Sequence, residues 1–401
     1  MLKDILLSSS SNLSMADLED NFGDYKLYGA TGFIKCIDFF DKDEEYIAIV
    51  KDGAGVGKSF LCDPKSSILS TLQYLTPKNK NNLKFSYYLL YNIHFEKYKV
   101  GSTIPHIYYK DYSKKKVFIP SIEEQRKIAN FLVNIDKKIN LLNQKQKLLR
   151  NFKKFCLQNI FSEDEKLRFK EFNKDWRNLN VEDIFDLTRG EVISKRILKV
   201  YPDNVYKYPV YSSQTLNKGI MGYYKNFDFN GDYITWTTDG ANAGKTMFRK
   251  GKFKCSNVCG VLKPKIEFRG MANQFIAEFL NSITYKYVSY VGNPKLMNNV
   301  MAKIKVAVPP IDEQKKISNF LFDIDKKIDL TQNQIDLMEK FKKGLLQQMF
   351  VYLILYISIF LILLFFKIIL NKLEYYFIFH LFKVLEITDK GAYDLIDIIL
   401  M

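Results

Sequence analysis

A long internal repeat is the feature that most constrains how this chain can fold. The segment VFIPSIEEQRKIANFLVNIDKKINLL, from Val117 to Leu142, recurs as VAVPPIDEQKKISNFLFDIDKKIDLT from Val306 to Thr331. The copies lie 189 residues apart without a gap, and about half of the positions are identical across the 45-residue unit 117–161. A repeat of this kind predicts two related halves rather than one unrepeated domain.

Each copy predicts a long amphipathic helix. Pro120 and Pro309 mark the starts, and acidic residues follow in the first turn, where they suit the helix dipole. Apolar residues then recur every seven positions, as in a coiled-coil seam. The predicted helix-pairing residues are Ile128, Ile135, Ile139, Leu142, Ile317, Ile324, Ile328 and Met338. Because two matching seams in one chain can pair, we expect an intramolecular helix pair, roughly 55–60 Å long at 1.5 Å per residue. The alternative is that each helix packs on its own domain.

The repeat divides the chain into alternating globular and helical segments. We expect a first globular domain over 1–119, a helix over 120–161, a second globular domain over 162–308, a helix over 309–350 and a tail over 351–401. Both globular segments are rich in Tyr, Phe, Gly and Asn and carry short apolar runs, which predicts mixed α/β domains with many short strands.

A Gly-rich loop follows a predicted strand in both globular segments. Residues 46–59 read YIAIVKDGAGVGKS, and residues 233–246 read YITWTTDGANAGKT. Both resemble a phosphate-binding P-loop, but its first glycine is replaced by Asp52 and Asp239, whose carboxylates would repel a phosphate. We therefore disfavour an NTPase and predict tight Gly-rich hairpins.

A second Gly-containing loop precedes each long helix. It reads GSTIPH over 101–106 and GNPKLM over 292–297. Together the two kinds of loop expose polar side chains and free backbone N–H groups, which can hold DNA phosphates or reach base edges. The alternative is a set of structural turns with solvated lysines. The candidate DNA contacts are Lys58, Ser59, Thr103, His106, Asn242, Lys245, Thr246, Asn293 and Lys295.

The composition favours an acidic partner. Sixty Lys and Arg face 44 Asp and Glu, which gives a formal net charge of +16. The hydrophobic share of 47% and the aromatic share of 15% exclude a disordered chain. The charge favours nucleic acid first and an anionic membrane surface second, although a Lys-rich composition inherited from an AT-rich genome would also produce it. The five cysteines show no pairing or metal-binding pattern, so we expect free thiols in a reducing cytoplasm.

Catalytic motifs are absent from the sequence. It has no Asn/Asp-Pro-Pro-aromatic segment of the amino-methyltransferase kind, no G-x-G-x-x-G after a strand, no H-E-x-x-H and no G-x-S-x-G. Three histidines offer little general-base capacity near neutral pH. We expect a chain without catalytic activity of its own.

The pattern Pro-x-Ile-x-Glu-Gln-x-Lys-Ile occurs at 120–128 and again at 309–317. Each copy leads into a coiled helix and follows a Tyr-rich domain that ends in a Gly-polar loop. In order, spacing and duplication, residues 1–350 resemble the specificity subunit of type I restriction–modification enzymes.

The resemblance implies two target-recognition domains, each reading one half of an asymmetric, bipartite site in double-stranded DNA. It implies that the two helices pair antiparallel about a pseudo-twofold axis, separate the domains and dock two modification subunits. Those subunits methylate adenine with S-adenosylmethionine, and restriction subunits add translocation and cleavage that use ATP and Mg. The specificity subunit itself binds no cofactor and is not catalytic.

The tail departs from the family pattern. Residues 351–370 are apolar and long enough to span a bilayer. An aberrant or rearranged C-terminus, a membrane anchor and a helix packed on the bundle all remain open. Two alternatives to the leading hypothesis follow: a membrane-tethered coiled-coil adaptor, and a silent phase-variable copy of the specificity subunit.

Overall fold

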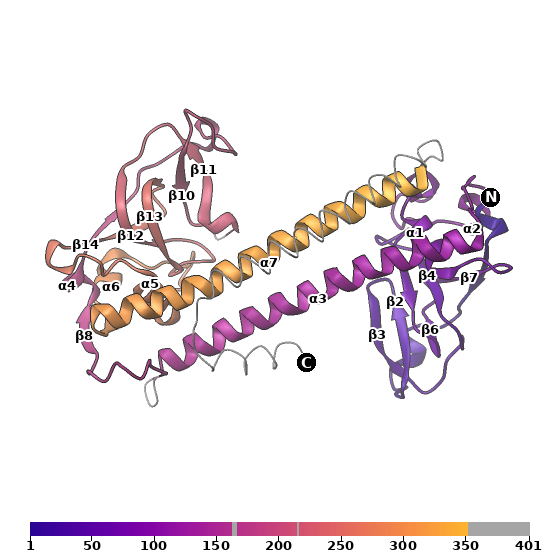
Figure 1. Cartoon of the computed structure of the whole chain (residues 1–401), viewed down its shortest axis with the longest axis horizontal. Helices are drawn as coiled ribbons and strands as arrows, with labels where there is room; N and C mark the ends of the chain where they lie inside the picture. Colours follow the sequence, from indigo (N-terminus) through magenta and orange to yellow (C-terminus); the bar gives the residue numbers. More distant parts are fainter. Residues whose placement is uncertain (163–166, 215, 352–401) are drawn as a thin grey trace. The chain divides into compact units, whose positions relative to one another are not determined.

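The chain divides into two compact units, each with a mixed α/β globular part. The computed structural model describes residues 1–162, 167–214 and 216–351, and Figure 1 shows its elements. The first unit comprises residues 1–137 and 338–401, and the second comprises 138–337. Within the described ranges, no helix is both long and apolar enough to cross a membrane. The apolar tail predicted over 351–401 lies, beyond Val351, outside the described residues.

The first unit contains two small sheets. Their strands are β1 (Leu6–Ser10), β2 (Tyr25–Gly29), β3 (Gly32–Ile37), β4 (Tyr46–Val50), β5 (Ser59–Cys62), β6 (Ser66–Ile68) and β7 (Leu72–Pro77). They form a four-stranded sheet in the order β1-β7-β4-β5 and a three-stranded sheet in the order β3-β2-β6. Two short helices follow, α1 (Leu83–Leu90) and α2 (Tyr109–Tyr112). The apolar β4 is buried along its whole length, as a central strand covered on both faces should be.

The second unit contains a larger sheet and a separate strand pair. Its strands are β8 (Arg177–Asn180), β9 (Phe185–Arg189), β10 (Tyr208–Tyr211), β11 (Ile220–Tyr224), β12 (Phe229–Thr237), β13 (Thr246–Cys255), β14 (Cys259–Pro264) and β15 (Lys305–Val308). Six strands pair in the order β11-β10-β13-β12-β14-β9, and β15 pairs with β8. The short helices are α4 (Val181–Ile184), α5 (Gln274–Ile283) and α6 (Asn298–Ala302).

The duplication extends to the globular parts. The antiparallel order β1-β7-β4-β5 has its counterpart in β9-β14-β12-β13. The hairpin β2–β3 corresponds to β10–β11, because β2 runs parallel to β6 just as β10 runs parallel to β13. The single strand β13 is therefore represented by β5 and β6 together. The break between them contains Lys65, whose φ of 52° lies in the left-handed region and interrupts the strand.

The two long helices are α3 (Ile122–Ile160) and α7 (Ile311–Val351). They begin two residues after Pro120 and Pro309, the prolines that mark their starts in the sequence. Five predicted pairing residues in the middle of the helices are buried, namely Ile135, Ile139, Leu142, Ile324 and Ile328. The seven-residue periodicity therefore identifies a buried stripe on each helix.

Two of the remaining predicted pairing residues lie where a long helix meets a globular part. Ile317 is buried in the hydrophobic core of the second globular part, and Ile128 packs against the core of the first. Met338 is only half-buried. The first turns of each long helix lie against the globular part of the same unit. The last turns of the other long helix pack in the same cores, through Cys156 and Ile160 in the second unit and Phe350 in the first.

Side chains join the two helices within each unit. In the second unit, Gln146 Nε2 donates to Gln332 Oε1 at 2.6 Å, and Lys153 Nζ donates to Asp325 Oδ1 at 2.8 Å. A step of seven residues forward along α3, from Gln146 to Lys153, moves the contact seven residues back along α7, from Gln332 to Asp325. These sections of the two helices therefore run antiparallel. In the first unit, Lys342 of α7 pairs with an α3 carboxylate in the same manner.

The glutamine of the repeated Glu-Gln motif fastens each long helix to its globular part. The buried Gln125 donates Nε2 to the Pro120 carbonyl at 3.0 Å and accepts the Asn82 backbone N–H at 2.9 Å. Asn82 is the N-cap of α1. The buried Gln314 donates to the Pro309 carbonyl at 2.8 Å and accepts from the N-cap residue of α5 at 2.8 Å. An amide, which both donates and accepts, is the group this position requires.

Candidate nucleic-acid interface

The Gly-rich loops form the same tight turn in both units. In the first unit, Val50 N–H donates to the Lys58 carbonyl at 2.8 Å, and Gly57 N–H returns a bond to Val50 at 2.9 Å. In the second unit, Thr237 and Lys245 are joined in the same way at 2.9 Å. Gly57 has a φ of 88°, so only glycine fits this turn without strain. The prediction of hairpin turns instead of P-loops is confirmed by this geometry.

The prediction that these loops expose free backbone N–H groups is partly wrong. The N–H groups of Val56, Gly57 and Lys58 are bonded within the turn or to its flanking strand. The Gly53 N–H is bonded as well, to the Pro105 carbonyl. The turn satisfies these donors itself, as a short hairpin does, whereas the Ala54 and Gly55 N–H groups have no backbone partner among the described residues. The groups left for a ligand are those two N–H groups and the side chains.

The two predicted loops lie against each other in both units. In the first unit, Gly53 N–H donates to the Pro105 carbonyl at 2.8 Å. In the second unit, Gly240 N–H donates to the Pro294 carbonyl at 2.9 Å. The second loop closes on itself through reciprocal backbone bonds, between Val100 and His106 in one unit and between Ser289 and Lys295 in the other. We call residues 51–58 with 100–107, and 238–245 with 289–296, the paired loops.

The aspartate that replaces the P-loop glycine contacts a basic residue of the second loop. Asp52 Oδ1 lies 2.7 Å from His106 Nδ1, and Oδ2 lies 2.5 Å from Lys51 Nζ. Burial acts to raise the pKa of Asp52, but the hydrogen bonds from Lys51 and His106 outweigh it and lower that pKa below the ordinary value. In the second unit, Asp239 Oδ1 lies 4.0 Å from Lys295 Nζ. His106 and Lys295 therefore occupy equivalent positions.

Most of the predicted contacts are accessible in the paired loops. Lys58, Thr103, Asn242, Lys245, Asn293 and Lys295 are exposed, while Ser59 and His106 are partly buried. Thr246 is an exception, because only 4% of its surface is exposed and its Oγ1 donates to the Ala277 carbonyl of α5 at 2.6 Å. Thr246 is the first residue of β13 and points inward, so it is not a DNA contact.

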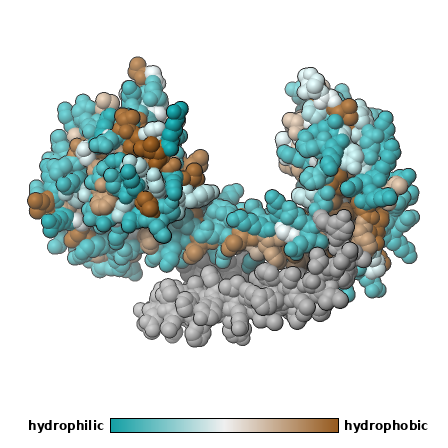
Figure 2. Space-filling view, turned by 90° about the horizontal axis from the view of Figure 1, so that it is seen from above, coloured by the Kyte–Doolittle hydropathy of each residue, from teal (hydrophilic) through white to brown (hydrophobic). Residues whose placement is uncertain are grey.

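Exposed apolar residues in and next to the paired loops were not predicted from the sequence. In the second unit Tyr290 and Val291 are 68% and 92% exposed, directly before Gly292. In the first unit Ile104 and Tyr108 are 57% and 49% exposed. Figure 2 shows hydrophobic residues at the surface of the second globular part, on the left. The clustering of Tyr285, Tyr287 and Tyr290 was the available signal, because exposed aromatic groups can stack on bases.

A buried arginine, Arg249, contacts the backbone of the exposed Lys218 in the second unit. Arg249 of β13 donates to Thr235 Oγ1 at 3.0 Å and to the Lys218 carbonyl at 2.7 Å, and its guanidinium lies 3.6 Å from the centre of the Tyr211 ring. Burial lowers the pKa of Arg249. Lys218, held in the left-handed region, forms an ion pair with Asp329 of α7. Arg249 therefore holds the backbone of Lys218, and the Lys218 side chain contacts the long helix within the second unit.

Comparisons with known proteins match most of the chain. Residues 1–151 and 173–340 match the family model described as the type I restriction modification DNA specificity domain. A putative type I specificity subunit of Mycoplasma pneumoniae is 32% identical over 224 residues, which cover 56% of this chain and 80% of that protein. The specificity subunit of the type I restriction enzyme MpnII, from the same organism, is 35% identical over 181 residues, covering 42% and 53%.

A solved structure has a similar fold. The crystal structure of the type I restriction–modification system S subunit from M. genitalium superposes with a TM-score of 0.67. The match covers 88% of this chain and 95% of that one, at 20% sequence identity.

Proposed function

The chain belongs to the type I restriction–modification DNA specificity family, and from this premise we propose how its two units read DNA. Each unit uses its paired loops to contact one half of a bipartite target in double-stranded DNA. The chain is the specificity subunit of its system, and it positions partner subunits that carry out the chemistry.

The duplicated paired loops carry this proposal. The two sets share the same backbone bonds, yet their side chains differ at equivalent positions, such as His106 in the first and Lys295 in the second. Two loop sets with the same backbone bonds and different side chains suit recognition of two different DNA sequences. Side chains contact base edges, while the shared backbone scaffold sets their position. The expected target is therefore asymmetric.

The charge of the chain supports a phosphate contribution to binding. The net charge is +16, and Lys58 and Lys245 are exposed beside the turns. Contacts between lysine and phosphate release counterions, so affinity should fall steeply with salt.

We propose that α3 and α7 form an antiparallel coiled-coil pair along their length, with each copy of the repeat facing the other. The buried residues Ile135 and Ile324 and the antiparallel contacts within each unit support this arrangement. Such a pair gives the chain a pseudo-twofold axis.

We further propose that a face of this helix pair docks the modification subunits. Leu141 and Leu148 on α3 are 61% and 68% exposed, and their repeat counterparts Leu330 and Leu337 on α7 are 47% and 66% exposed. The antiparallel register places Leu141 level with Leu337, and Leu148 level with Leu330. The proposed twofold axis is perpendicular to the plane that contains the two helix axes. Residues that this axis relates, such as Leu141 and Leu330, therefore lie on the same face of the helix pair. Four exposed leucines on one face are typical of a protein interface. S-adenosylmethionine, ATP and Mg belong to the partner subunits.

Methylation mapping tests the proposal. The chain is produced together with a modification subunit of its system in cells that lack other adenine methylation, and the methylated sites are sequenced. We expect methylated adenines in a split, asymmetric site, and the substitutions Lys58→Ala and Lys245→Ala should each relax or lose one half. Palindromic sites, or no methylation by an assembled complex, would contradict the proposal.

A further inference from the structure

A pair of aromatic rings occurs at the same place in both globular parts. The ring centres of Tyr208 and Phe227 lie 5.0 Å apart in the second unit, and those of Tyr25 and Phe40 lie 4.7 Å apart in the first. Each tyrosine begins the first strand of a hairpin, β10 in the second unit and β2 in the first. The rings therefore mark equivalent surfaces of the two units.

The charges beside these rings are opposite in the two units. The residue before the hairpin and the residue after it are lysines in the second unit and aspartates in the first, and a third position on the neighbouring strand changes in the same way. All six side chains are exposed. The equivalent residues are Lys207 and Asp24, Lys225 and Asp38, and Lys250 and Asp63.

The strand registers establish the third equivalence. The residue before Lys250 pairs with Tyr233 across β13 and β12, and the residue before Asp63 pairs with Tyr46 across β5 and β4. Both tyrosines are the first residues of the Gly-rich segments that the two units share. Lys250 and Asp63 therefore occupy the same position in the two sheets.

The lysines of the second unit gather around the aromatic pair. Lys207 Nζ lies 5.3 Å from the centre of the Tyr208 ring, and Lys252 Nζ lies 4.7 Å from the centre of the Phe227 ring. Lys250 and Lys252 are both exposed and stand at alternate positions of β13, so they point to the same face of the strand. We call the four exposed lysines of this region the lysine surface, namely Lys207, Lys225, Lys250 and Lys252.

The lysine surface is not neutralised by ion pairs. Asp228, which follows Phe227, is held by Lys254 at 2.6 Å. Asp232 lies opposite Lys250 in the strand register but forms no ion pair with it. Among the described residues, no carboxylate is paired with any of the four lysines. Their positive charges therefore remain free for a partner.

The surrounding segments differ in the same sense. Residues 207–255 contain eight Lys and Arg and three Asp, whereas the equivalent residues 24–68 contain six Lys and eight Asp and Glu. Lys252 corresponds to Lys65, so three of the four positions of the lysine surface change sign. A positive surface attracts a polyanion and a negative one repels it. The first unit therefore has no equivalent of the lysine surface.

The strand β13 connects the lysine surface to the paired loops. Lys245 is the last residue of a paired loop, and Lys250 follows it by five residues along β13, a distance of at most about 17 Å at about 3.4 Å per residue. One helical turn of B-DNA is about 34–36 Å long. A duplex that touches the paired loops can therefore reach the lysine surface within half a turn, which favours DNA over an acidic protein as its partner.

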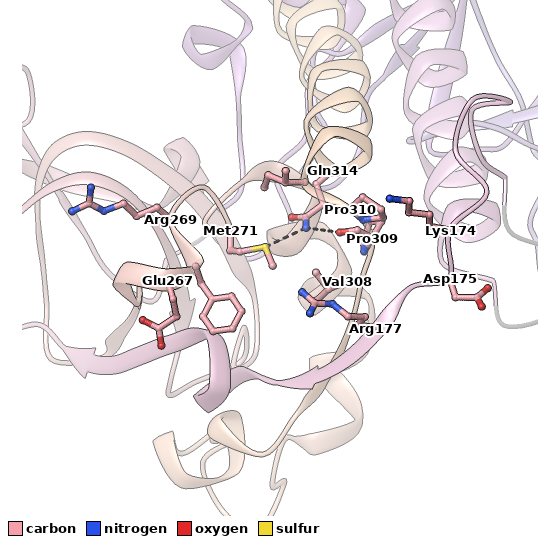
Figure 3. A pocket seen from close by; sticks show the side chains of 12 residues that line it. Lys174, Asp175, Arg177, Glu267, Arg269, Met271, Val308, Pro309, Pro310 and Gln314 are labelled. Atoms are coloured by element: carbon pink, nitrogen blue, oxygen red, sulfur yellow. Dashed lines mark hydrogen bonds between the residues drawn. The ribbon is translucent and has the colours of Figure 1, made fainter.

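A second group of cations in the same unit is balanced by acids. Lys174, Arg177 and Arg269 line a cavity of about 500 Å³, but Asp175 and Glu267 line it as well (Figure 3). Mixed charges attract a polyanion only weakly. The cavity therefore provides a reference lysine, Lys174, which is exposed like those of the lysine surface.

We propose that the lysine surface binds backbone phosphates of the duplex beside the bases that the paired loops of the second unit contact. The first unit, with aspartates at three of these positions, makes no such contact. The two units are therefore unequal: the second supplies more of the affinity that depends on salt, and the first contributes mainly through its paired loops. This inference rests on the proposed function and adds to it a phosphate contact that only one half of the chain makes.

Charge-reversed variants of the full chain test the lysine surface. Lys207→Asp, Lys225→Asp and Lys250→Asp each introduce the residue that the first unit carries, and binding to a fluorescent duplex of about three helical turns is followed by anisotropy over a range of salt concentrations. Each substitution should weaken binding at least about threefold and reduce the slope of log affinity against log salt by about one, and the triple variant should reduce it by about three.

Lys174→Asp is the matched control, because it reverses one exposed lysine of the same unit at the cavity of mixed charge. It should change the affinity less than about twofold and leave the slope unchanged. Melting temperatures should match that of the parent chain, since the lysine surface forms no ion pairs among the described residues. Lys→Ala at the same three positions removes the charges without adding carboxylates, and it should give the same loss of slope should a reversed variant fail to fold.

Equal slopes for the triple variant and Lys174→Asp would overturn the inference. If Lys245→Ala still reduces the slope in that case, the paired loops keep their proposed role and only the lysine surface is refuted. If Lys58→Ala and Lys245→Ala have no effect while the triple variant does, the proposed function fails and the phosphate contact stands. Unchanged DNA binding together with weaker association with the purified modification subunit would also overturn the inference, because it would assign the lysine surface to an acidic protein.

Discussion

Lys153 of α3 lies 2.8 Å from Asp325 of α7, and this ion pair is repeated in the other unit by Lys342 and Asp136 at 2.6 Å. Lys153 and Lys342 are 189 positions apart, and so are Asp136 and Asp325. The repeat therefore preserves both members of the ion pair. Both pairs also contact the globular part of their unit: Lys153 contacts Glu278 of α5 at 2.7 Å, and Asp136 accepts a hydrogen bond from the Tyr88 hydroxyl of α1 at 2.7 Å. The helix contact is thus tied to the globular part by an ion pair in the second unit and by a phenol in the first.

Replacing Lys153 should destabilise the second unit. Burial raises the pKa of Asp325, although Lys153 acts to lower it, and Lys153→Met removes that compensation and leaves two carboxylates close together. We expect a loss of about 2–3 kcal/mol in the free energy of unfolding at neutral pH. A carboxyl group whose folded-state pKa lies above its unfolded value destabilises when it ionises, so the loss should shrink as the pH falls toward the carboxyl range.

Urea unfolding across pH measures this effect. The matched control is Lys154→Met, because Lys154 is the exposed neighbour on the same helix, and it should change stability by less than about 0.5 kcal/mol. Equal effects of the two substitutions would show that the ion pair contributes nothing measurable.

The motif glutamine should resist even an isosteric change. Gln314→Glu keeps the shape but replaces the donor that bonds the Pro309 carbonyl with an acceptor. At neutral pH a buried carboxylate would face that carbonyl, at an expected cost of about 2–4 kcal/mol. When protonated, the group can donate again, so the cost should be smaller near pH 4 and grow as the pH rises above the unfolded value of about 4.3.

The exposed Gln144 on α3 provides the comparison. Gln144→Glu should be nearly neutral at every pH in the same unfolding experiment. If Gln314→Glu shows a penalty that does not depend on pH, packing and not the lost donor would be its cause.

The long helices could be predicted from sequence because their signals are local. Proline, an acidic first turn and a seven-residue period placed α3 and α7 within two residues of their observed starts. The period could not identify what each apolar residue faces. Ile317 and Ile324 occupy the same heptad position, yet Ile317 lies in the globular core, because a heptad pattern describes a buried face without identifying its partner.

The meeting of the paired loops could not be predicted. Gly53 and Pro105 lie far apart in the sequence and are joined by backbone atoms alone, which leave no side-chain pattern. The error at Thr246 was avoidable. Side chains alternate along a strand, so a residue next to the exposed Lys245 at the start of β13 should point inward.

Lysines of the paired loops should contribute to DNA binding through phosphates. Lys58→Ala and Lys245→Ala should each weaken binding to duplex DNA and reduce the slope of log affinity against log salt by about one. Thr246→Val should leave the slope unchanged and cost about 1 kcal/mol of stability, because it removes a buried hydrogen bond. Fluorescence anisotropy over a range of salt concentrations distinguishes the two effects. A slope that changes with Thr246→Val but not with Lys245→Ala would exclude this role for the loop.

The exposed leucines of the helix pair should matter for assembly and not for folding. Leu148→Asp and Leu330→Asp each place a charge on a side chain that is 68% or 47% exposed, so the melting temperature of the isolated chain should barely change. If this face docks the modification subunit, each substitution should weaken that association at least about tenfold, since burying a charge in an apolar interface is costly.

Val192→Asp is the control, because Val192 is 84% exposed on the globular part and should leave association unchanged. Association is measured by calorimetry with the purified modification subunit, and DNA binding by the isolated chain should remain at its parent level in all three variants. Unaltered association of the double variant Leu148→Asp, Leu330→Asp would assign the docking face elsewhere on the chain.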